Sequence, residues 1–314
     1  MSLEPLKLAF FGSPAFAVPV LEALVRHHDV ALVVTQPDRP AGRGLGLRAP
    51  AAAERARELG LRLEQPSRLK GNEGFEALLR ELELDVAVTA AYGRILPGSL
   101  LEVPRHGFLN VHASLLPRYR GAAPVQWALI EGERETGVSI MQTDVGLDTG
   151  PVRLQRRLPI AETDDAATLL DELSVLGAET LLEALRLLGE GTLPLTPQDD
   201  AAATLAPPLK PEDGWVRWGD PAQRIVDRHR GVALWPGSSF EHDGQRVKVE
   251  ALQLAASDER AAPGTVLATT AGGLLVAAGD GAVELQRVKP PGKRAMSARD
   301  WANGRGVKEG ARLG

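Results

Sequence analysis

Three side chains that could act together on a substrate stand in two short stretches of the sequence. Asn110 and His112 are two residues apart in an apolar run, so both would point to the same face of a β-strand. Asp148 lies between Gly146 and Gly150, in a loop free to bring its carboxylate beside the histidine. These residue types can donate hydrogen bonds and carry protons. The spacing therefore predicts a candidate amide–imidazole–carboxylate set of Asn110, His112 and Asp148.

Each member of this set also has a structural interpretation. A single histidine in a strand is often a structural residue whose hydrogen bonds are satisfied. Asn110 could be a turn residue, and Asp148 could form a turn with its flanking glycines. Ser114 lies close enough to His112 to suggest a nucleophile, but the sequence has no GxSxG around it. The residues alone leave these alternatives open.

The segment that follows His112 is apolar where a connection would normally be polar. Leu115, Leu116 and Pro117 stand there in a row. The run before them would end at the carboxyl edge of a sheet, where open α/β sheets bind their ligands. We therefore interpret these three residues as a wall for a flat ring.

The elements that would position these residues alternate along the first 188 residues. Short apolar runs closed by turn residues predict strands, and amphipathic stretches between them predict helices. This alternation predicts an α/β fold, a Rossmann-like open parallel sheet with helices on both faces. The predicted strands are Leu6–Phe11, Val30–Thr35, Asp85–Ala90, Gly107–Ala113 and Gly137–Thr143, and the predicted helices are Ala17–Val25, Ala51–Leu59, Glu73–Leu82 and Asp165–Leu188.

The composition changes after residue 188. Residues 189–214 are rich in proline and lack periodicity, so we expect a linker between a catalytic domain, 1–188, and a second domain, 215–314. A helix is expected at Pro221–Arg230. Short β-rich runs divided by Gly and Asp then predict a small, OB-like β-barrel. These runs are Ser239–His242, Arg246–Leu254, Gly264–Thr269, Gly273–Ala277 and Ala282–Arg287.

Composition narrows the chemistry. The chain has no cysteine, which excludes disulfides and thiol catalysis, and its six histidines lack HxH or HExxH spacing, so we expect no bound metal. No apolar run approaches the roughly 20 residues of a membrane span, and the first residues do not resemble a signal peptide. We therefore expect a cytoplasmic protein that binds no membrane. The glycines match neither GxGxxG nor GxxxxGK[ST], which argues against NAD and ATP.

Charge is distributed unevenly along the chain. The net charge of the chain is −5, but residues 207–314 include 16 basic and 13 acidic residues. Within residues 287–314 there are 8 basic and 2 acidic residues. A basic tail of this kind can be simply a solvated surface. Clustered Lys and Arg are also what phosphate binding requires, whatever the charge of the whole chain. Composition does not choose between the two.

Several motifs together resemble those of one enzyme family. Asn110–His112, Ser114–Pro117, Arg120-Gly121 and the Asp148 loop resemble the signature of the folate-dependent formyltransferases. Three further features resemble the branch that acts on methionyl-tRNA, and they extend the resemblance over essentially the whole chain. These are FFGSPAFAVPVLEAL in the first strand and helix, the inserted loop TQPDRPAGRG, and the C-terminal segments VALWPGSSF, QRVKV, APGTVL and PPGKRAMSARD.

The resemblance implies transfer of formyl from 10-formyltetrahydrofolate to the α-amino group of methionine on initiator methionyl-tRNA. This reaction belongs to one-carbon metabolism and supports translation initiation. Asn110 and protonated His112 would donate hydrogen bonds to the developing oxyanion. Asp148 would keep His112 charged and oriented, or relay protons through water. No metal and no covalent enzyme intermediate are implied.

The resemblance also implies binding residues, with no obligate protein partner evident. Arg43 is the expected key tRNA contact, although the family commonly carries lysines after Arg43-Gly44, where this sequence has Leu45, Gly46 and Leu47. For folate, the implied residues are Ser114, Leu115, Leu116, Pro117, Tyr92 and Gly93; for tRNA, they are Arg39, Arg43, Arg48, Lys289, Lys293 and Arg294.

Two other functions remain to be weighed. A sugar-nucleotide formyltransferase would share LNVHASLLPRYRG but would not need the basic cluster after Arg287. A tRNA-binding module without catalysis would keep the basic residues and could lose Asn110 or His112. Both of these residues are present, which favours an enzyme.

Overall fold

The computed structural model describes residues 4–41 and 46–314. The chain forms two compact units, and neither is one continuous stretch of sequence. Unit 1 consists of the chain up to Pro124 together with Glu135–Ile160 and Leu169–Pro207. Unit 2 consists of Val125–Arg134, Ala161–Thr168 and Pro208–Gly314.

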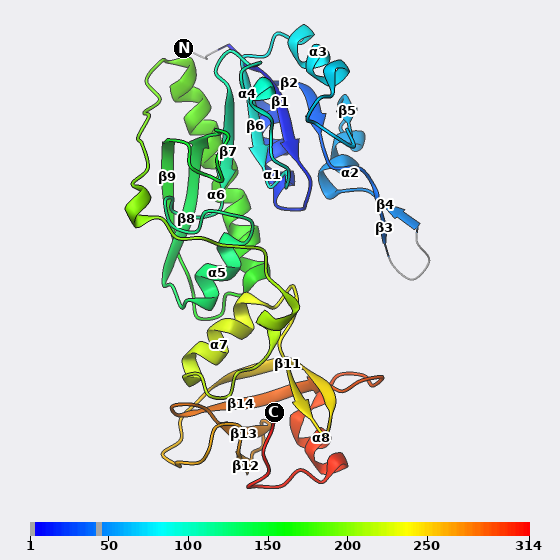
Figure 1. Ribbon diagram of the computed structural model, residues 1–314, viewed down its shortest axis with the longest axis vertical. Coiled ribbons are helices and arrows are strands. Elements are labelled where there is room, and N and C mark those ends of the chain that lie inside the picture. Colours follow the sequence, from blue (N-terminus) through cyan, green and yellow to red (C-terminus); the bar gives the residue numbers. More distant parts are fainter. Residues whose placement is uncertain (1–3, 42–45) are drawn as a thin grey trace. The chain divides into compact units, whose positions relative to one another are not determined.

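Unit 1 is built on a seven-stranded sheet with the order β5-β2-β1-β6-β7-β8-β9 (Figure 1). The first five of these strands pair in parallel, and β8 and β9 are antiparallel. The predicted Rossmann-like α/β class is thus confirmed, as a mixed sheet. Its strands are β1 (Lys7–Gly12), β2 (Asp29–Val34), β5 (Leu63–Glu64), β6 (Val86–Ala90), β7 (Phe108–His112), β8 (Glu135–Gln142) and β9 (Val152–Pro159).

Helices cover both faces of this sheet. On one face, Phe75 and Leu100 pack in a core with Phe11 and Phe108. On the other face, Gly177 lies so close to the side chain of Val111 that an added Cβ would be 2.7 Å from it. The helices of unit 1 are α1 (Ala17–His27), α2 (Ala51–Glu58), α3 (Glu73–Glu81), α4 (Gly98–Leu101) and most of α6 (Ala166–Gly189), whereas nearly all of α5 (Pro124–Ile130) belongs to unit 2.

The loop expected at residues 36–49 contains a short hairpin. Strands β3 (Arg39–Ala41) and β4 (Gly46–Arg48) pair antiparallel, with Arg39 opposite Arg48. Arg43 and the rest of 42–45 lie outside the described residues.

Unit 2 contains an antiparallel sheet with the strand order β10-β11-β14-β13-β12, and β15 pairs with β14. These strands form a half-barrel, whereas the sequence led us to expect a small barrel. Trp218, Phe240 and Trp301 meet edge to face in its core. The elements are α7 (Ala222–Gly231), β10 (Ser239–His242), β11 (Gln245–Ala255), β12 (Val266–Thr269), β13 (Leu274–Ala277), β14 (Ala282–Lys289), β15 (Met296–Ser297) and α8 (Ala298–Arg305).

Most of the segment that we expected to be a linker, 189–214, is held by unit 1. The backbone of Thr196 pairs with Val152, and Arg120 pairs with Thr204 and Ala206. Two 3-10 helices, η1 (Asp200–Ala202) and η2 (Pro211–Gly214), interrupt the segment. The change of unit comes after Pro207. The division into domains at 188 and 215 remains a proposal.

One further property concerns membranes. Within the two described ranges, no helix has both the length and the apolar character needed to cross a bilayer.

Candidate active site

Strand β7 presents two polar side chains on one face, next to the core. Phe108, Asn110 and His112 alternate with Leu109 and Val111, so the first three share a face. Phe108 is part of the hydrophobic core on that face, and the two polar residues follow it toward the carboxyl end of the strand. The sequence-based prediction that Asn110 and His112 point the same way therefore agrees with the strand.

The amide of Asn110 is oriented by the neighbouring strand. Thr89 lies opposite Asn110 in the β6–β7 ladder, and its hydroxyl donates a hydrogen bond of 2.8 Å to Asn110 Oδ1. Because the amide oxygen is used in this way, the Nδ2 group is the part of Asn110 that can donate to a substrate.

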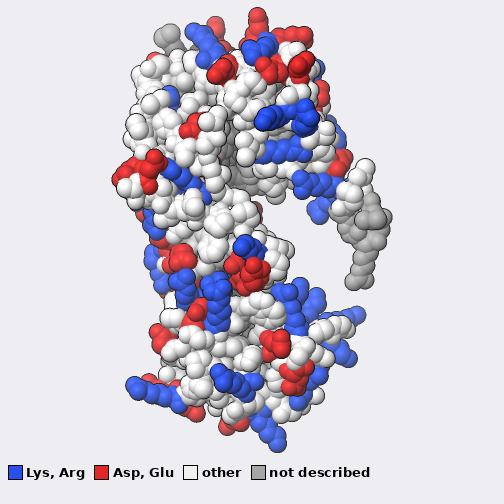
Figure 2. Space-filling view, in the orientation of Figure 1, with Lys and Arg blue, Asp and Glu red and all other residues white. Residues whose placement is uncertain are grey.

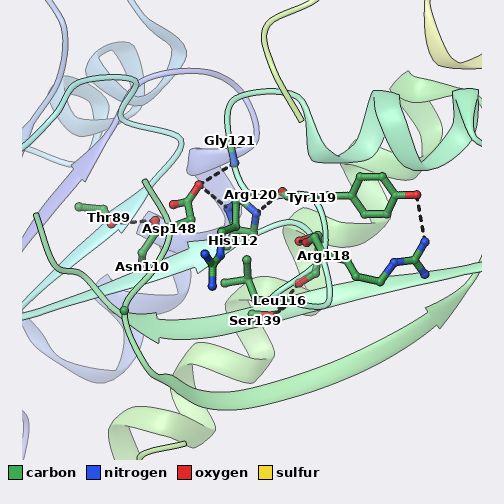
Figure 3. A network of polar contacts seen from close by, with 12 residues as sticks. Thr89, Asn110, His112, Leu116, Arg118, Tyr119, Arg120, Gly121, Ser139 and Asp148 are labelled. Carbon is green, nitrogen blue, oxygen red and sulfur yellow. Dashed lines mark hydrogen bonds and ion pairs between the residues drawn. The ribbon is translucent and has the colours of Figure 1, made fainter. Parts of the chain in front are cut away.

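His112 is almost completely buried, with 6% of its side chain exposed, and both ring nitrogens have defined neighbours. Nε2 lies 2.9 Å from the carbonyl oxygen of Tyr119. A carbonyl can only accept, so Nε2 carries a proton and donates it there. Nδ1 lies 3.7 Å from Asp148 Oδ2 (Figure 3). Nδ1 is therefore the nitrogen that can respond to a substrate and to the carboxylate.

The carboxylate of Asp148 is held by a backbone amide on the other side of the site. The N–H of Gly121 donates a hydrogen bond of 2.8 Å to Asp148 Oδ2. Gly121 has φ of +126°, and an added Cβ would lie 2.6 Å from the carbonyl oxygen of Ala206. Only glycine fits such a backbone beside such a neighbour. The Arg120-Gly121 motif thus fixes the oxygen of Asp148 that faces His112.

The loop that carries Asp148 is also tightly shaped from within. Asp144 Oδ1 accepts hydrogen bonds from the N–H of Gly146 (3.0 Å) and from the hydroxyl of Thr149 (2.9 Å). A Cβ on Gly150 would lie only 1.9 Å from the carbonyl oxygen of Gln142. The glycines of this loop let the chain pass close to β8, and hydrogen bonds within the loop define its shape.

The apolar segment after His112 lies under the site. Ser114 is buried, and its hydroxyl donates to the carbonyl of Arg118 (2.7 Å). The proton of this hydroxyl is therefore directed to a backbone carbonyl and not to His112. Leu116 is buried, and its N–H donates to the hydroxyl of Ser139. Leu115 packs over Gly137, and Pro117 is half-buried. Their assignment as folate-binding residues remains a proposal; their observed contacts include Gly137 and Ser139 on β8 and Gln155 on β9.

Tyr92 and Gly93 follow β6, beside β7. The ring of Tyr92 is buried edge to face against Phe11, and burial raises the pKa of its hydroxyl to about 12. The amide of Gln36 donates to the carbonyl of Tyr92 (2.8 Å) and, at 3.4 Å, to that of Gly93. The assignment of Tyr92 and Gly93 as folate-binding residues remains a proposal.

Exposed apolar side chains flank the site in the two loops that follow β6 and β8. Ile95, Val145 and Leu147 are 87%, 76% and 61% exposed. Val145 is near the start of α4, since a Cβ on Gly98 would be 3.7 Å from its Cγ1. Sequence reasoning did not single out these three residues. The exposure of apolar side chains is a signal for binding that only the folded chain reveals.

The predicted tRNA-binding residues fall on both units. Arg39 and Arg48 are exposed on the β3–β4 hairpin, where Arg39 donates to the side-chain carbonyl of Gln36. In unit 2, Lys289 ends β14, and Lys293 and Arg294 are exposed in the β14–β15 connection. Figure 2 shows many Lys and Arg side chains on the drawn face of this unit.

No metal-binding group is evident in the part of the chain that the structure describes, where no three His, Asp or Glu side chains gather suitably. The absence of a metal remains an expectation from the sequence.

Comparison with known proteins identifies the family. The Formyl transferase family model matches residues 6–185, and the model of the formyl transferase C-terminal domain matches residues 208–306. The chain belongs to the formyl transferase family. It is 56% identical to the methionyl-tRNA formyltransferase of Deinococcus radiodurans, over 98% of this chain and 95% of that protein. It is 49% identical to the methionyl-tRNA formyltransferase of Thermus thermophilus, over 98% of this chain and 99% of that protein.

Solved structures share the fold of this formyl transferase at low identity. The N-formyltransferase of Helicobacter canadensis, in complex with folinic acid and dTDP-3-aminofucose, gives a TM-score of 0.69 at 17% identity, over 90% of this chain and 99% of that one. HypX of Aquifex aeolicus, in complex with tetrahydrofolic acid, gives 0.64 at 19% identity, over 97% of this chain. The chain spans about half the length of HypX, since it covers 48% of that protein.

Proposed function

We propose that this formyl transferase moves the formyl group of 10-formyltetrahydrofolate to the α-amino group of methionine esterified to initiator tRNA. The observation that carries the proposal is the convergence of Asn110, His112 and Asp148 on one site. This site lies in a chain that is 56% identical, nearly end to end, to a methionyl-tRNA formyltransferase. A role in translation initiation and a cytoplasmic location belong to the same proposal.

The folate supplies the formyl carbon, and its N10 is the leaving group. Attack by the amine forms the new C–N bond, the old C–N10 bond breaks, and one proton passes in net from the amine to N10. Asn110 Nδ2 can donate to the formyl oxygen while that oxygen carries negative charge. Such a donor typically contributes about 10²–10³ to the rate.

His112 acts through Nδ1 in this scheme, because Tyr119 already accepts the proton on Nε2. A protonated Nδ1 can donate to the oxyanion, and the carboxylate of Asp148 stabilises that protonated ring. The separation of 3.7 Å leaves Nδ1 uncommitted before a substrate binds. Hydrogen bonds of this kind often shorten only when the reaction complex forms. Asp148 is also placed to relay the proton of the attacking amine through water.

The residues around the site suit a flat, partly polar ring. Ile95, Val145 and Leu147 offer exposed apolar surface, and the Tyr92–Gly93 backbone offers polar groups. A binding site for an aromatic ligand normally combines these two features. The proposal assigns the folate to this surface, with Ser114–Pro117 supporting the strand end beneath it.

Basic residues support an RNA acceptor. Lys248 and Lys289 lie directly opposite each other on β11 and β14, and both are exposed. Like charges in this arrangement destabilise a sheet, unless an anion binds between them. With Lys293 and Arg294 nearby in sequence, this surface offers sequence-independent contacts to phosphates. Arg39, Arg43 and Arg48 are assigned to discrimination of the acceptor stem.

The test is a comparison of acceptors. The protein is incubated with radiolabelled 10-formyltetrahydrofolate and either initiator methionyl-tRNA or an amino-sugar nucleotide, with His112→Gln as the inactive control. We expect label on the methionine of the tRNA and none on the sugar. Transfer to the sugar alone would replace the proposal with a sugar-nucleotide formyltransferase. Binding of tRNA without transfer to either acceptor would leave only a binding module.

A further inference from the structure

The segment Thr196–Ala206, which we call the strap, lies beside the loops that carry the catalytic residues. The sequence places it in a linker, yet every hydrogen bond described below joins it to unit 1. We propose that the strap positions His112 and Asp148 relative to each other, and that Gln198 and Thr204 are its positioning residues. The inference rests on the proposed function, because it assumes that these two side chains do the chemistry.

Gln198 holds the loop that carries Asp148. The side-chain NH₂ group of Gln198, Nε2, donates to the carbonyl of Asp148 (2.8 Å) and to the carbonyl of Gly150 (2.6 Å). Asp148 has φ of +52°, a left-handed conformation that a non-glycine residue rarely adopts without support. The two bonds supply that support on either side of Thr149, and they fix the backbone from which the carboxylate projects.

The orientation of the Gln198 amide is itself determined. Its Oε1 accepts from Nε and Nη2 of Arg120, at 3.0 and 2.9 Å. The guanidinium of Arg120 is buried, and Nη2 also donates to Asp200 on the strap (2.7 Å). A guanidinium can only donate, so the oxygen of Gln198 must face Arg120 and its NH₂ group must face the Asp148 loop.

Thr204 holds the other half of the pair. Its hydroxyl accepts from the N–H of Tyr119 (2.8 Å), and its carbonyl accepts from the N–H of Arg120 (2.8 Å). Tyr119, at φ of +61°, is the residue whose carbonyl accepts the Nε2 proton of His112. Ala206 completes the contact, because its N–H donates to the carbonyl of Arg120 (2.7 Å).

The strap therefore positions both His112 and Asp148, whose Nδ1 and Oδ2 atoms are 3.7 Å apart, through the backbone groups that these side chains contact. Tyr119 sets the ring of His112, and Gly121, two residues later, sets the carboxylate of Asp148. Displacing a catalytic group by about 1 Å can cost roughly 10²-fold in rate. Loss of the strap contacts is expected to lower kcat and to leave substrate binding nearly unchanged.

Gln198→Glu separates positioning from simple anchoring. The carboxylate can still accept from Arg120, but it cannot donate to the carbonyls of Asp148 and Gly150. We expect kcat for the acceptor to fall about 30- to 100-fold, with KM for the tRNA within about twofold. Gln198→Ala should fall at least as far.

Gln142→Glu is the matched control. The amide of Gln142 also donates to two backbone carbonyls of unit 1, those of His106 and Phe108, both at 3.1 Å. These carbonyls precede β7 or begin it, so the same chemical change is made away from the strap. If Gln142→Glu lowers kcat as much as Gln198→Glu at equal thermal stability, the positioning role of Gln198 is wrong.

Thr204 is tested by substitution and rescue. Thr204→Val keeps the shape of the side chain and removes the acceptor for the Tyr119 N–H, whereas Thr204→Ser restores it. We expect kcat to fall about tenfold or more in the first variant and to recover in the second. Equal rates in the two variants, or a change in KM alone, would overturn the assignment.

These outcomes are separable from failure of the proposed function. The wild-type protein is assayed first, with the acceptor that it formylates. If that acceptor is a sugar nucleotide, the tRNA proposal fails, but the kcat comparison of the Gln198 and Thr204 variants is made in the same way and still decides the role of the strap.

Discussion

The replacement Asp148→Asn tests the central interaction of the site. It preserves the shape of the side chain and an acceptor for the Gly121 N–H, and it removes only the charge. At 3.7 Å, two unit charges attract by about 4 kcal/mol at an effective dielectric of about 20. Asp148 is 18% exposed, so solvent reduces this attraction to about 2–4 kcal/mol. Because about 1.4 kcal/mol changes a rate tenfold, we expect kcat to fall roughly 30- to 1000-fold.

The assay is steady-state formylation of initiator methionyl-tRNA, with KM measured for both substrates. KM should change little, because the charge of Asp148 matters most when His112 is protonated in the transition state. Asp144→Asn is the control, since Asp144 is in the same loop and bonds only to the loop itself in the described contacts. It should lower kcat less than tenfold. Equal losses in the two variants would show that loop shape, and not the charge beside His112, accounts for the effect.

Three further predictions concern stability. Burial lowers the pKa of His229, so below about pH 6.5 the unfolded chain binds more protons. Stability should therefore fall as the pH drops through that range, and it should fall less in His229→Gln. The measurement is the urea concentration at the unfolding midpoint as a function of pH, and the same pH dependence in the two proteins would contradict this. Among the described residues the Tyr92 hydroxyl is buried without a hydrogen-bond partner, so Tyr92→Phe should raise the free energy of unfolding by about 1 kcal/mol. If the same variant instead shows a raised KM for folate, the hydroxyl contacts the ligand. Gly150→Ala should lower the free energy of unfolding by about 1–3 kcal/mol, because the new Cβ collides with the Gln142 carbonyl. Gly304→Ala, in open space on α8, should raise it by up to about 1 kcal/mol. Thermal melts in which the first variant is the more stable would refute the packing argument.

Local sequence determined the elements that carry the site. Apolar runs closed by turn residues predicted strands β1, β2, β6, β7 and β8 within one or two residues. Strand periodicity placed Asn110 and His112 on one face without reference to any other residue. The Arg-rich strand β9 was missed because it lies at the edge of the sheet, where outward polar residues obscure an apolar pattern.

The sequence also indicated the chemistry, but it could not supply the contacts. His112 and Asp148 were paired by their residue types and by resemblance. Their separation depends on two backbone groups, the Tyr119 carbonyl and the Gly121 N–H, which have no signature in a one-dimensional pattern. Leu115 packs over Gly137 and the N–H of Leu116 donates to Ser139, both on β8, and the role of Leu115–Pro117 as a wall for a flat ring stays a prediction. Ile95, Val145 and Leu147 are exposed apolar residues in the loops after β6 and β8.

The strap shows most clearly what only the tertiary structure decided. Its proline, Pro197, and its lack of periodicity are typical of a linker, and nothing in the residues near Gln198 or Thr204 indicates a partner. Their hydrogen bonds reach across 78 residues to Arg120 and 85 residues to Tyr119. Sequence periodicity indicates which face of a segment is buried, but it does not predict hydrogen bonds between segments that are distant in the sequence. The residues thus specified which groups could do the chemistry, and the packing of distant segments specified how those groups face each other.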